Sequence, residues 1–267
     1  YVLGQGQVPP SGKLNIAGVG VGGQGGGVLG EMKGENIVAL CDVDWAKAAG
    51  TFNAFPKAER FKDYRVMLEK RKDIEAVMIA TPDHMHAPIT LAALRAGKHV
   101  YVEKPMAHTI EEARVMTKVA RETGLVTQMG NNGNGTDAQR RKIEILQAGV
   151  LGDISEIHIS TDRPIWPQGI DRPEGSDPIP DSLNWDCWLG LAPERPYKQD
   201  VYHAFKWRGW FDFGTGAMGD MACHGMSFFF RGLGLGEVLT AETIKTTPRF
   251  KETYPCATTV KVVVRSS

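Results

Sequence analysis

The chain has 267 residues, enough for one large domain or two ordinary ones, and 42% of them are hydrophobic, as in a globular protein with a substantial core. Lys+Arg and Asp+Glu both number 31, so the net charge is zero, and we expect no nucleic-acid partner because such partners require a basic excess. No apolar run approaches the ~20 residues that cross a bilayer, so no membrane span is expected.

The first half of the chain alternates between short apolar runs and helical stretches. Residues 1–12 are rich in glycine and proline and predict an arm that lies over the domain. We expect strands at 13–19, 36–41, 75–80, 98–102 and 125–129, with helices at about 24–33, 44–52, 63–71, 86–96 and 109–123. Apolar strands joined by helical crossovers predict an α/β fold whose doubly wound parallel sheet is covered on both faces.

The first strand runs into a glycine-rich turn. The pattern G-x-G-x-x-G is met by Gly20, Gly22 and Gly25 and, one frame earlier, by Gly18, Gly20 and Gly23. We prefer the first frame because it lets the strand run through Val19. Such glycines make a tight turn, admit a pyrophosphate and let the next helix pack close to the strand, with its N-terminus toward the phosphates. The turn, which includes Gln24, therefore predicts a Rossmann-type dinucleotide-binding domain.

An acidic residue ends the second strand. Asp42 lies 22 residues after Gly20, close to the offset of the acid that binds the adenine ribose. Its carboxylate would accept hydrogen bonds from the 2′- and 3′-hydroxyls and repel a 2′-phosphate, which favours NAD over NADP. Asp44 is an equal candidate, and an ordinary acid in a strand-end turn is the alternative.

The pattern of expected elements changes near residue 150, which indicates a second domain. A helix at about 136–148 and glycines at 149 and 152 place the boundary near residue 150, which gives domains at 13–150 and 151–267. The second domain is expected to contain an alternating strand at 154–160, a long loop at 162–212, a helix at about 216–230 and strands near 237–246 and 257–264. A last strand so near the end of the chain indicates that this α+β domain is incomplete.

Two turns follow strands at the carboxyl edge of the sheet, where open α/β folds bind ligands. Thr81 and Pro82 begin the first turn, and His84 and His86 lie within it. Helical residues two apart point away from each other and no third ligand is nearby, so we expect no metal site there or elsewhere. A loop beside the cofactor is favoured, and a helix cap is the alternative.

The second turn contains Glu103, Lys104 and Pro105. A lysine at this edge can be desolvated and can then exchange a proton with a bound alcohol or carbonyl group. The proline could fix the turn, and a cis peptide bond before it is one way to do so. A surface turn with an ordinary ion pair is the alternative.

The helix expected at 216–230 carries a polar pair. Asp220 and His224 are four residues apart, so they share one face among apolar neighbours. A buried aspartate–histidine pair costs free energy unless both groups are satisfied, which favours a catalytic pair. A structural hydrogen bond between them remains the alternative.

With these motifs, the chain resembles the glucose–fructose oxidoreductase/inositol dehydrogenase (Gfo/Idh/MocA) family. The resemblance implies an open, mostly antiparallel sheet in the second domain, a chain longer than 267 residues, and an NAD(P)-dependent oxidoreductase. It implies substrate-site roles for Lys104, Asp220 and His224, and cofactor contacts for Thr81, Pro82, His86, Glu103, Lys104, Gln128 and Asn131.

The resemblance also implies a class of substrate, a cellular location and an oligomeric state. The substrate would be a sugar, sugar derivative, glycoside or cyclitol, and contacts from Arg163, Trp166, Trp185 and Trp210 are possible, although large aromatic residues more often lie in a core. Besides a dehydrogenase, a redox-neutral NAD-dependent glycosidase and a non-catalytic sugar-binding protein remain open. The opening residues are similar to those that follow a twin-arginine signal in exported bacterial members, so a periplasmic location is expected, or otherwise a cytoplasmic one. A homodimer or homotetramer is expected.

Overall fold

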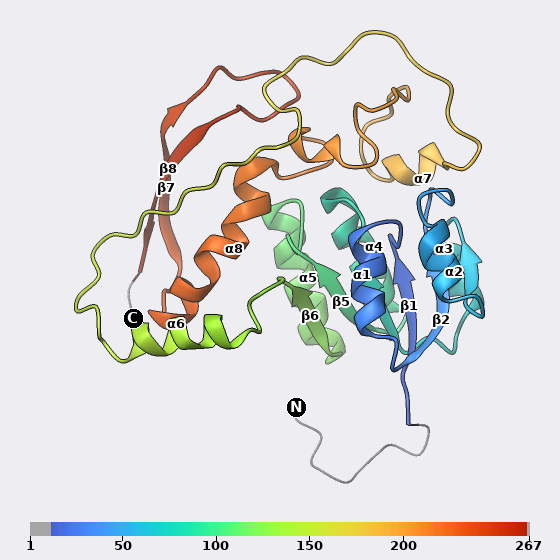
Figure 1. Ribbon diagram of the computed structural model, residues 1–267, viewed down its shortest axis with the longest axis horizontal. Helices are drawn as coiled ribbons and strands as arrows, with labels where there is room; N and C mark the ends of the chain where they lie inside the picture. The colour runs from blue at the N-terminus through green and yellow to red at the C-terminus, as the bar shows by residue number, and fades with distance from the viewer. Residues whose placement is uncertain (1–11, 266–267) are drawn as a thin grey trace. The chain divides into compact units, whose positions relative to one another are not determined.

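The computed structural model describes residues 12–265, which form two compact units (Figure 1). Residues up to Met129 together with Asp177–Tyr197 make the first unit, and Gly130–Ser176 together with Lys198 onward make the second. The unit boundaries thus differ from the expected division at residue 150, because the second unit begins earlier and one of its loops returns to the first. The expected arm at 1–12 lies outside the described residues except for Gly12.

The first unit is built on a six-stranded sheet in the order β3-β2-β1-β4-β5-β6. Its strands are β1 (Asn15–Val19), β2 (Asn36–Cys41), β3 (Glu59–Phe61), β4 (Ala76–Ile79), β5 (His99–Glu103) and β6 (Thr127–Gly130). The chain runs outward from β1 in both directions, so the strand order reverses between β1 and β4, the place where such sheets bind ligands. The expected parallel Rossmann sheet is confirmed, and only the three-residue β3 was not predicted.

Helices connect these strands close to the expected positions. They are α1 (Gln24–Glu31), α2 (Ala49–Ala54), α3 (Tyr64–Lys70), α4 (His86–Arg95), α5 (Ile110–Thr123) and the short α7 (Trp185–Leu189), which was not expected. α2 begins later than the expected residue 44, because the Asp44 carboxylate caps a turn by accepting from the amides of Ala46 and Lys47. α5 begins where predicted, at a capping box in which Thr109 and Glu112 satisfy each other's backbone amides.

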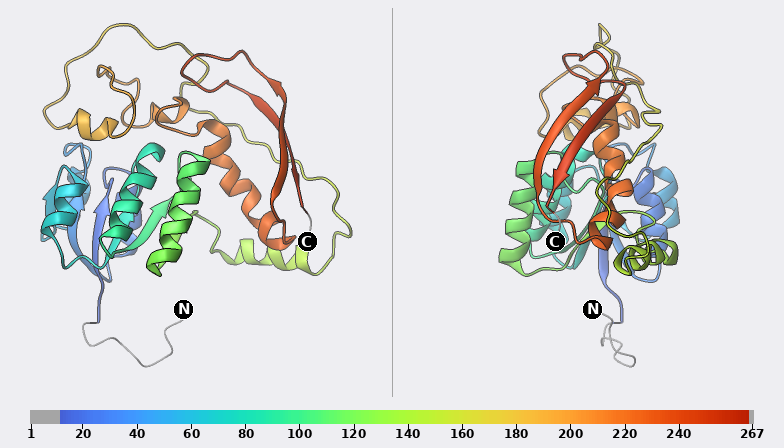
Figure 2. Two further views of the ribbon diagram at one scale, coloured as in Figure 1. Left: turned by 180° about the vertical axis from the view of Figure 1, so that it is seen from behind. Right: turned by 90° about the vertical axis from the view of Figure 1, so that its left-hand side faces the viewer.

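Both faces of the sheet are covered, and side chains alternate between the two cores. Ala17 and Val19 of β1 belong to the core under α3, α4 and α5, whereas Ile16 belongs to the core under α1 and α2. Figure 2 shows the blue helices α1 and α2 and the green helix α5 on opposite sides of the sheet. Because both faces of the sheet are covered by apolar packing, polar side chains of a site can lie together only at the ends of the strands.

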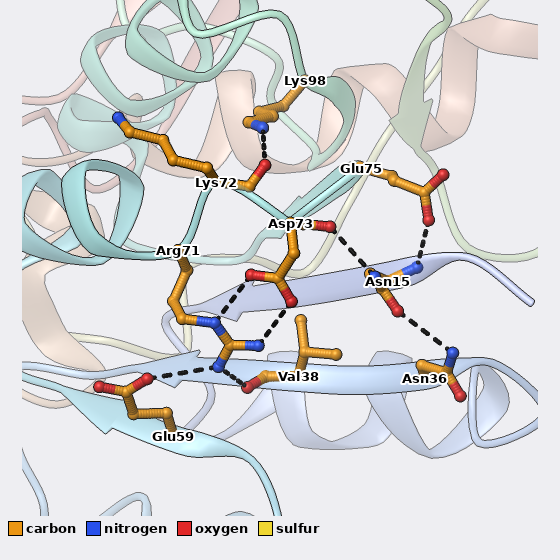
Figure 3. Close-up of polar contacts among 9 residues, drawn as sticks. All are labelled: Asn15, Asn36, Val38, Glu59, Arg71, Lys72, Asp73, Glu75 and Lys98. Carbon is orange, nitrogen blue, oxygen red and sulfur yellow. Dashed lines mark hydrogen bonds and ion pairs between the residues drawn. The ribbon is translucent and has the colours of Figure 1, made fainter.

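The amino-terminal edge of the sheet is held by a polar network (Figure 3). The Arg71 guanidinium donates to both carboxylate oxygens of Asp73, at 2.9 and 2.8 Å, and to the carbonyl of Val38 at 2.7 Å. The Glu75 carboxylate accepts from the Asn15 amide at 2.8 Å. These bonds connect β1, β2 and the loop before β4, so this edge is occupied by the protein's own contacts.

The second unit combines two longer helices with an antiparallel pair of strands. Its elements are α6 (Asp137–Gln147), α8 (Gly216–Gly232), β7 (Val238–Thr246) and β8 (Thr258–Val264). α6 packs against α8, and a Cβ at Gly232 would press on the Leu146 side chain. None of the helices in the described residues is both long enough and apolar enough to cross a membrane.

The strand expected at 154–160 is wrong. These residues are irregular and mostly exposed, although their side chains alternate in polarity. A strand needs a hydrogen-bonded neighbour. Among the described residues β7 and β8 pair with each other, and neither pairs with 154–160. Alternation alone therefore gave a false strand prediction here.

Candidate functional site

The glycine turn after β1 has the geometry of the preferred frame. Gly20 has φ +77°, and a Cβ there would lie 2.7 Å from the amide nitrogen of Thr81. A Cβ at Gly25 would fall on the carbonyl oxygen of Gly20, whereas one at Gly23 would meet open space. Gly20 and Gly25 are therefore the glycines that make the turn and the close helix packing, and α1 begins at Gln24 with its free amides beside them.

Asp42 lies directly beside this turn. Its carboxylate accepts from the Gly22 amide at 2.8 Å and from the Asp44 amide at 2.9 Å, and the residue is 9% exposed. Asp44 serves a different purpose, because its carboxylate accepts from the Ser182 hydroxyl at 2.9 Å. Of the two aspartates, Asp42 is therefore the candidate for the ribose.

The residues present fit a bound NAD. Gly20, Gly22 and Gly25 form a cradle: a Cβ at Gly20 or Gly25 would collide with backbone, and a Cβ at Gly22 would be crowded against the Asp42 carboxylate at 3.2 Å. In the part of the chain that is described, the Thr81 hydroxyl is buried without a hydrogen-bond partner, so it can bond to a ligand at this edge. The glycine turn would hold the pyrophosphate, Asp42 would hold the adenine ribose, and Thr81 would bond to an adjoining polar group of the cofactor.

Lys104 follows β5 at the same edge of the sheet. Glu103 is buried and accepts from the Tyr101 hydroxyl at 3.1 Å, and burial together with this carboxylate raises the pKa of Tyr101 to about 12. Lys104 is half-buried, and its peptide bond to Pro105 is cis, as the sequence allowed. Lys104 thus directly follows a buried carboxylate at this edge of the sheet.

His86 connects the two turns at this edge. Its ring is 1% exposed, with Nδ1 2.7 Å from the Pro105 carbonyl oxygen and Nε2 2.8 Å from the Thr81 carbonyl oxygen. Burial lowers the pKa of His86, although the two carbonyl groups act in the opposite direction. Both ring nitrogens lie within hydrogen-bonding distance of the protein's own carbonyl oxygens, so His86 holds Thr81 and Pro105 together, and its expected contact with the cofactor stays a prediction.

Gln128 and Asn131 bracket the end of β6. Gln128 is exposed and donates to the carbonyl of Met129 at 2.7 Å. The Asn131 amide belongs to the second unit and donates to the carbonyl of Cys223, the neighbour of His224, at 2.8 Å. The Asn131 side-chain oxygen is buried without a partner among the residues described, which makes it a candidate ligand acceptor.

The second unit presents the polar pair on α8. Asp220 and His224 are on one helical face, and the Asp220 carboxylate lies 3.4 Å from Nε of Arg208. Asp220 is 7% exposed, so this cation compensates a buried charge. Arg208 was not predicted to belong to the site; an arginine flanked by Trp207 and Trp210 was its only sequence signal.

The tryptophans expected at the substrate are core residues. Trp210 is fully buried, donates to the carbonyl of Val201 at 3.2 Å and packs edge-on against Tyr202. Trp166 is also buried, and its indole donates to the Gln168 side chain. Trp185 is buried as well, against Trp188, so all three tryptophans pack in the protein interior, and their expected contact with a substrate stays a prediction.

The remaining substrate candidate is Arg163. Its side chain is partly exposed and pairs with Asp162 at 2.7 Å. Its expected substrate contact stays a prediction. Of the predicted site residues, the first unit brings together the glycine turn, Asp42, Thr81, His86 and Lys104; the second brings together Asn131, Asp220 and His224.

Comparisons with known proteins agree with this organisation. A model of an oxidoreductase family with an NAD-binding Rossmann fold matches residues 13–131, and the model of that family's C-terminal alpha/beta domain matches 144–231. A 1,5-anhydro-D-fructose reductase of Ensifer adhaerens is 41% identical over 80 residues, which cover 30% of this chain and 24% of the relative. A glycosyl hydrolase family 109 protein of Shewanella baltica is 30% identical over 132 residues, which cover 46% and 28%.

A solved structure is similar to most of the chain. It is an NAD binding oxidoreductase from Klebsiella pneumoniae, with 25% identity and a TM-score of 0.58, and the match covers 87% of this chain and 56% of that one. The matched parts of the curated relatives span about a quarter of their length. The chain belongs to the Gfo/Idh/MocA family of oxidoreductases, and its first unit contains that family's NAD-binding Rossmann domain.

Proposed function

We propose that the protein is an NAD-dependent oxidoreductase that acts on a hydroxyl or carbonyl group of a sugar, a sugar derivative or a cyclitol. The proposal is supported by the family, by the reductase relative, and by a complete set of dinucleotide-binding features in the first unit. One observation carries it: the glycine turn, Asp42 and the Lys104 turn lie at one edge of one sheet.

Each residue has a defined task in this proposal. Asp42 accepts the ribose hydroxyls and disfavours a 2′-phosphate, so NAD is preferred to NADP. Bound NAD supplies the hydride acceptor. Lys104 or His224 takes the proton of the substrate hydroxyl during oxidation and returns it during reduction. Asp220, paired with Arg208, orients the histidine ring or a substrate hydroxyl.

The direct test is formation of NADH, followed by its absorbance, with a panel of free sugars and cyclitols. Lys104→Met removes the ammonium group at similar length and should lower kcat by about 10²-fold or more, the usual contribution of a general acid–base group. Lys57→Met is the matched control, because Lys57 is exposed and lies just before β3, at the amino-terminal end of that strand and not at the carboxyl edge. Unchanged kcat in Lys104→Met would remove the lysine from the mechanism, and a chain that binds no NAD would refute the function.

A redox-neutral glycosidase is the second candidate, because glycosyl hydrolase family 109 proteins are among the relatives. Such an enzyme would need NAD and the same acid–base groups, but it would regenerate the cofactor in each turnover. Incubation with chromogenic glycosides separates the two functions. Release of the aglycone without net NADH supports the glycosidase, whereas net NADH with free sugars supports the dehydrogenase.

A further inference from the structure

A loop that interrupts the second unit returns to pack on the nucleotide-binding unit. Residues 177–197 belong to the first unit. The two ends of this loop are joined by a hydrogen bond, in which the Asp177 amide donates to the Tyr197 carbonyl at 2.9 Å. Its central part, residues 181–190, contains α7 and is called the cover segment below; Figure 1 shows α7 beyond the ends of α2 and α3. Nothing in the proposed chemistry uses this segment.

The cover segment is bonded to the loop that follows β2. The Asn184 amide donates to the Val43 carbonyl at 2.8 Å, and the Trp45 amide donates to the Ser182 carbonyl at 3.1 Å. The Ser182 hydroxyl adds a third bond, to the Asp44 carboxylate at 2.9 Å. Because Asp44 in turn donates its amide to Asp42, the cover segment holds the loop on which the ribose acid stands.

The cover segment also reaches the loops after β3 and β4. The Lys62 ammonium donates to the Asp181 carbonyl at 3.4 Å, and Nε2 of His84 lies 3.1 Å from the Trp188 carbonyl oxygen. A Cβ at Gly190 would fall on the sulfur of Met85. One short segment thus contacts the loops at the carboxyl ends of β2, β3 and β4. Of these strands, β2 and β3 belong to the half of the sheet that holds the adenosine part of a dinucleotide in a fold of this strand order.

We propose that the cover segment completes the adenosine subsite and fixes the loop behind Asp42, so that the ADP-ribose half of the cofactor is held more tightly. The inference rests on the proposed function, since it requires NAD as the ligand. Its physical basis is preorganisation: a loop already tied by three hydrogen bonds has less conformational freedom to lose when the ribose binds. The nicotinamide half should not depend on these contacts.

The test compares binding of ADP-ribose and of nicotinamide mononucleotide by titration calorimetry on the whole chain. Ser182→Ala removes one hydrogen bond to a carboxylate and should weaken ADP-ribose binding about fivefold, with nicotinamide mononucleotide unchanged. Ser176→Ala, the same substitution at an exposed site in the second unit, should change neither. Equal weakening of both ligands, or no effect of Ser182→Ala, would overturn the proposal.

Hydrogen exchange on the unmodified protein provides a second readout. ADP-ribose should slow amide exchange in residues 43–45 and 182–188, and nicotinamide mononucleotide should not. Unchanged exchange in both stretches would also overturn the inference. Failure of the wild-type chain to bind ADP-ribose would refute the proposed function itself, whereas binding that is insensitive to the cover segment would refute only the inference.

Discussion

At the scale of single residues, Asp42 is both a ligand candidate and a structural anchor. Its two carboxylate oxygens accept from the amides of Gly22 and Asp44. We expect Asp42→Asn to weaken NAD binding about tenfold, because hydrogen bonds to a charged group are lost, and to reduce discrimination against NADP, because the negative charge is gone. Fluorescence titration with both nucleotides measures this.

The control for that prediction is Asp153→Asn, which neutralises an exposed carboxylate in the second unit and should leave both affinities unchanged. If Asp42→Asn kept the wild-type ratio of NAD to NADP affinity, the 2′-hydroxyl would not be recognised by this carboxylate.

His86 gives a prediction about pH. Burial lowers its pKa in the folded protein, so on acidification the unfolded chain takes up a proton at this histidine before the folded chain does. Stability should therefore fall as the pH drops below the ordinary histidine value of about 6.5. His86→Gln cannot titrate, so its free energy of unfolding should fall less between pH 7.5 and 5.5.

Urea unfolding at the two pH values measures this difference, with wild type as the reference. His158→Gln is a suitable control because His158 is exposed in the second unit. If His86→Gln lost as much stability on acidification as the wild type, the buried ring would not be the source of the pH dependence.

Whether a feature of the candidate site could be predicted depended on whether the residues around it are local in sequence. The glycine spacing and the position of Asp42 follow from one strand–turn–helix unit, so the sequence contained the necessary information. The burial of His86 and Trp210 could not be predicted, because it depends on contacts with other segments: Pro105 in the first case and Tyr202 in the second. Polar or aromatic identity alone does not reveal such partners.

At the scale of elements, Gly25 allows α1 to pack closely against the turn that follows β1. A Cβ at Gly25 would fall on the Gly20 carbonyl, whereas a Cβ at Gly27 on the same helix would meet nothing within 4 Å. We expect Gly25→Ala to lower the free energy of unfolding by about 1–3 kcal/mol through overpacking and to weaken NAD binding.

Gly27→Ala is the matched substitution, and its higher helix propensity should raise stability by up to about 1 kcal/mol without changing affinity. Urea unfolding and NAD titration on both variants test the pair. Equal stabilities of the two alanine variants would contradict the close packing at Gly25.

The elements that the sequence predicted well are those with local signals. α5 has a capping box at its start and a left-handed glycine, Gly124, after its end, and both were readable from the sequence. β3 and α7 are three and five residues long, too short for a periodic pattern. The false strand at 154–160 had the right alternation but lacked a partner strand among the described residues.

At the scale of the whole molecule, the division of the chain into two units could not be predicted from the pattern of expected strands and helices. Alternating strands and helices indicated a Rossmann domain correctly, but the return of 177–197 to that domain depends on backbone hydrogen bonds such as that between Asn184 and Val43. Residues 162–212 were expected to be one long loop, and loops of that length usually carry a function or contacts. The structure shows that residues 181–190 of this stretch contact the loops around the nucleotide-binding edge.

The strands of the second unit lead to a prediction about assembly. Every residue of β7 is exposed, including Leu239 and Ile244, and a two-stranded sheet is marginally stable by itself. We expect this surface to bind a second copy of the chain, giving a homodimer or homotetramer. Ile244→Glu, at a side chain that is 56% exposed, should shift the mass measured by light scattering to that of a monomer at equal concentration.

Ile110→Glu is the matched control, because Ile110 is an equally apolar, exposed residue at the first turn of α5, where a carboxylate is tolerated by the helix dipole. It should leave the mass unchanged. A wild-type chain that stays monomeric across the concentration range would contradict the prediction. An oligomer that persists in Ile244→Glu would place the contact on another surface, since a buried glutamate between apolar strands is not compatible with association.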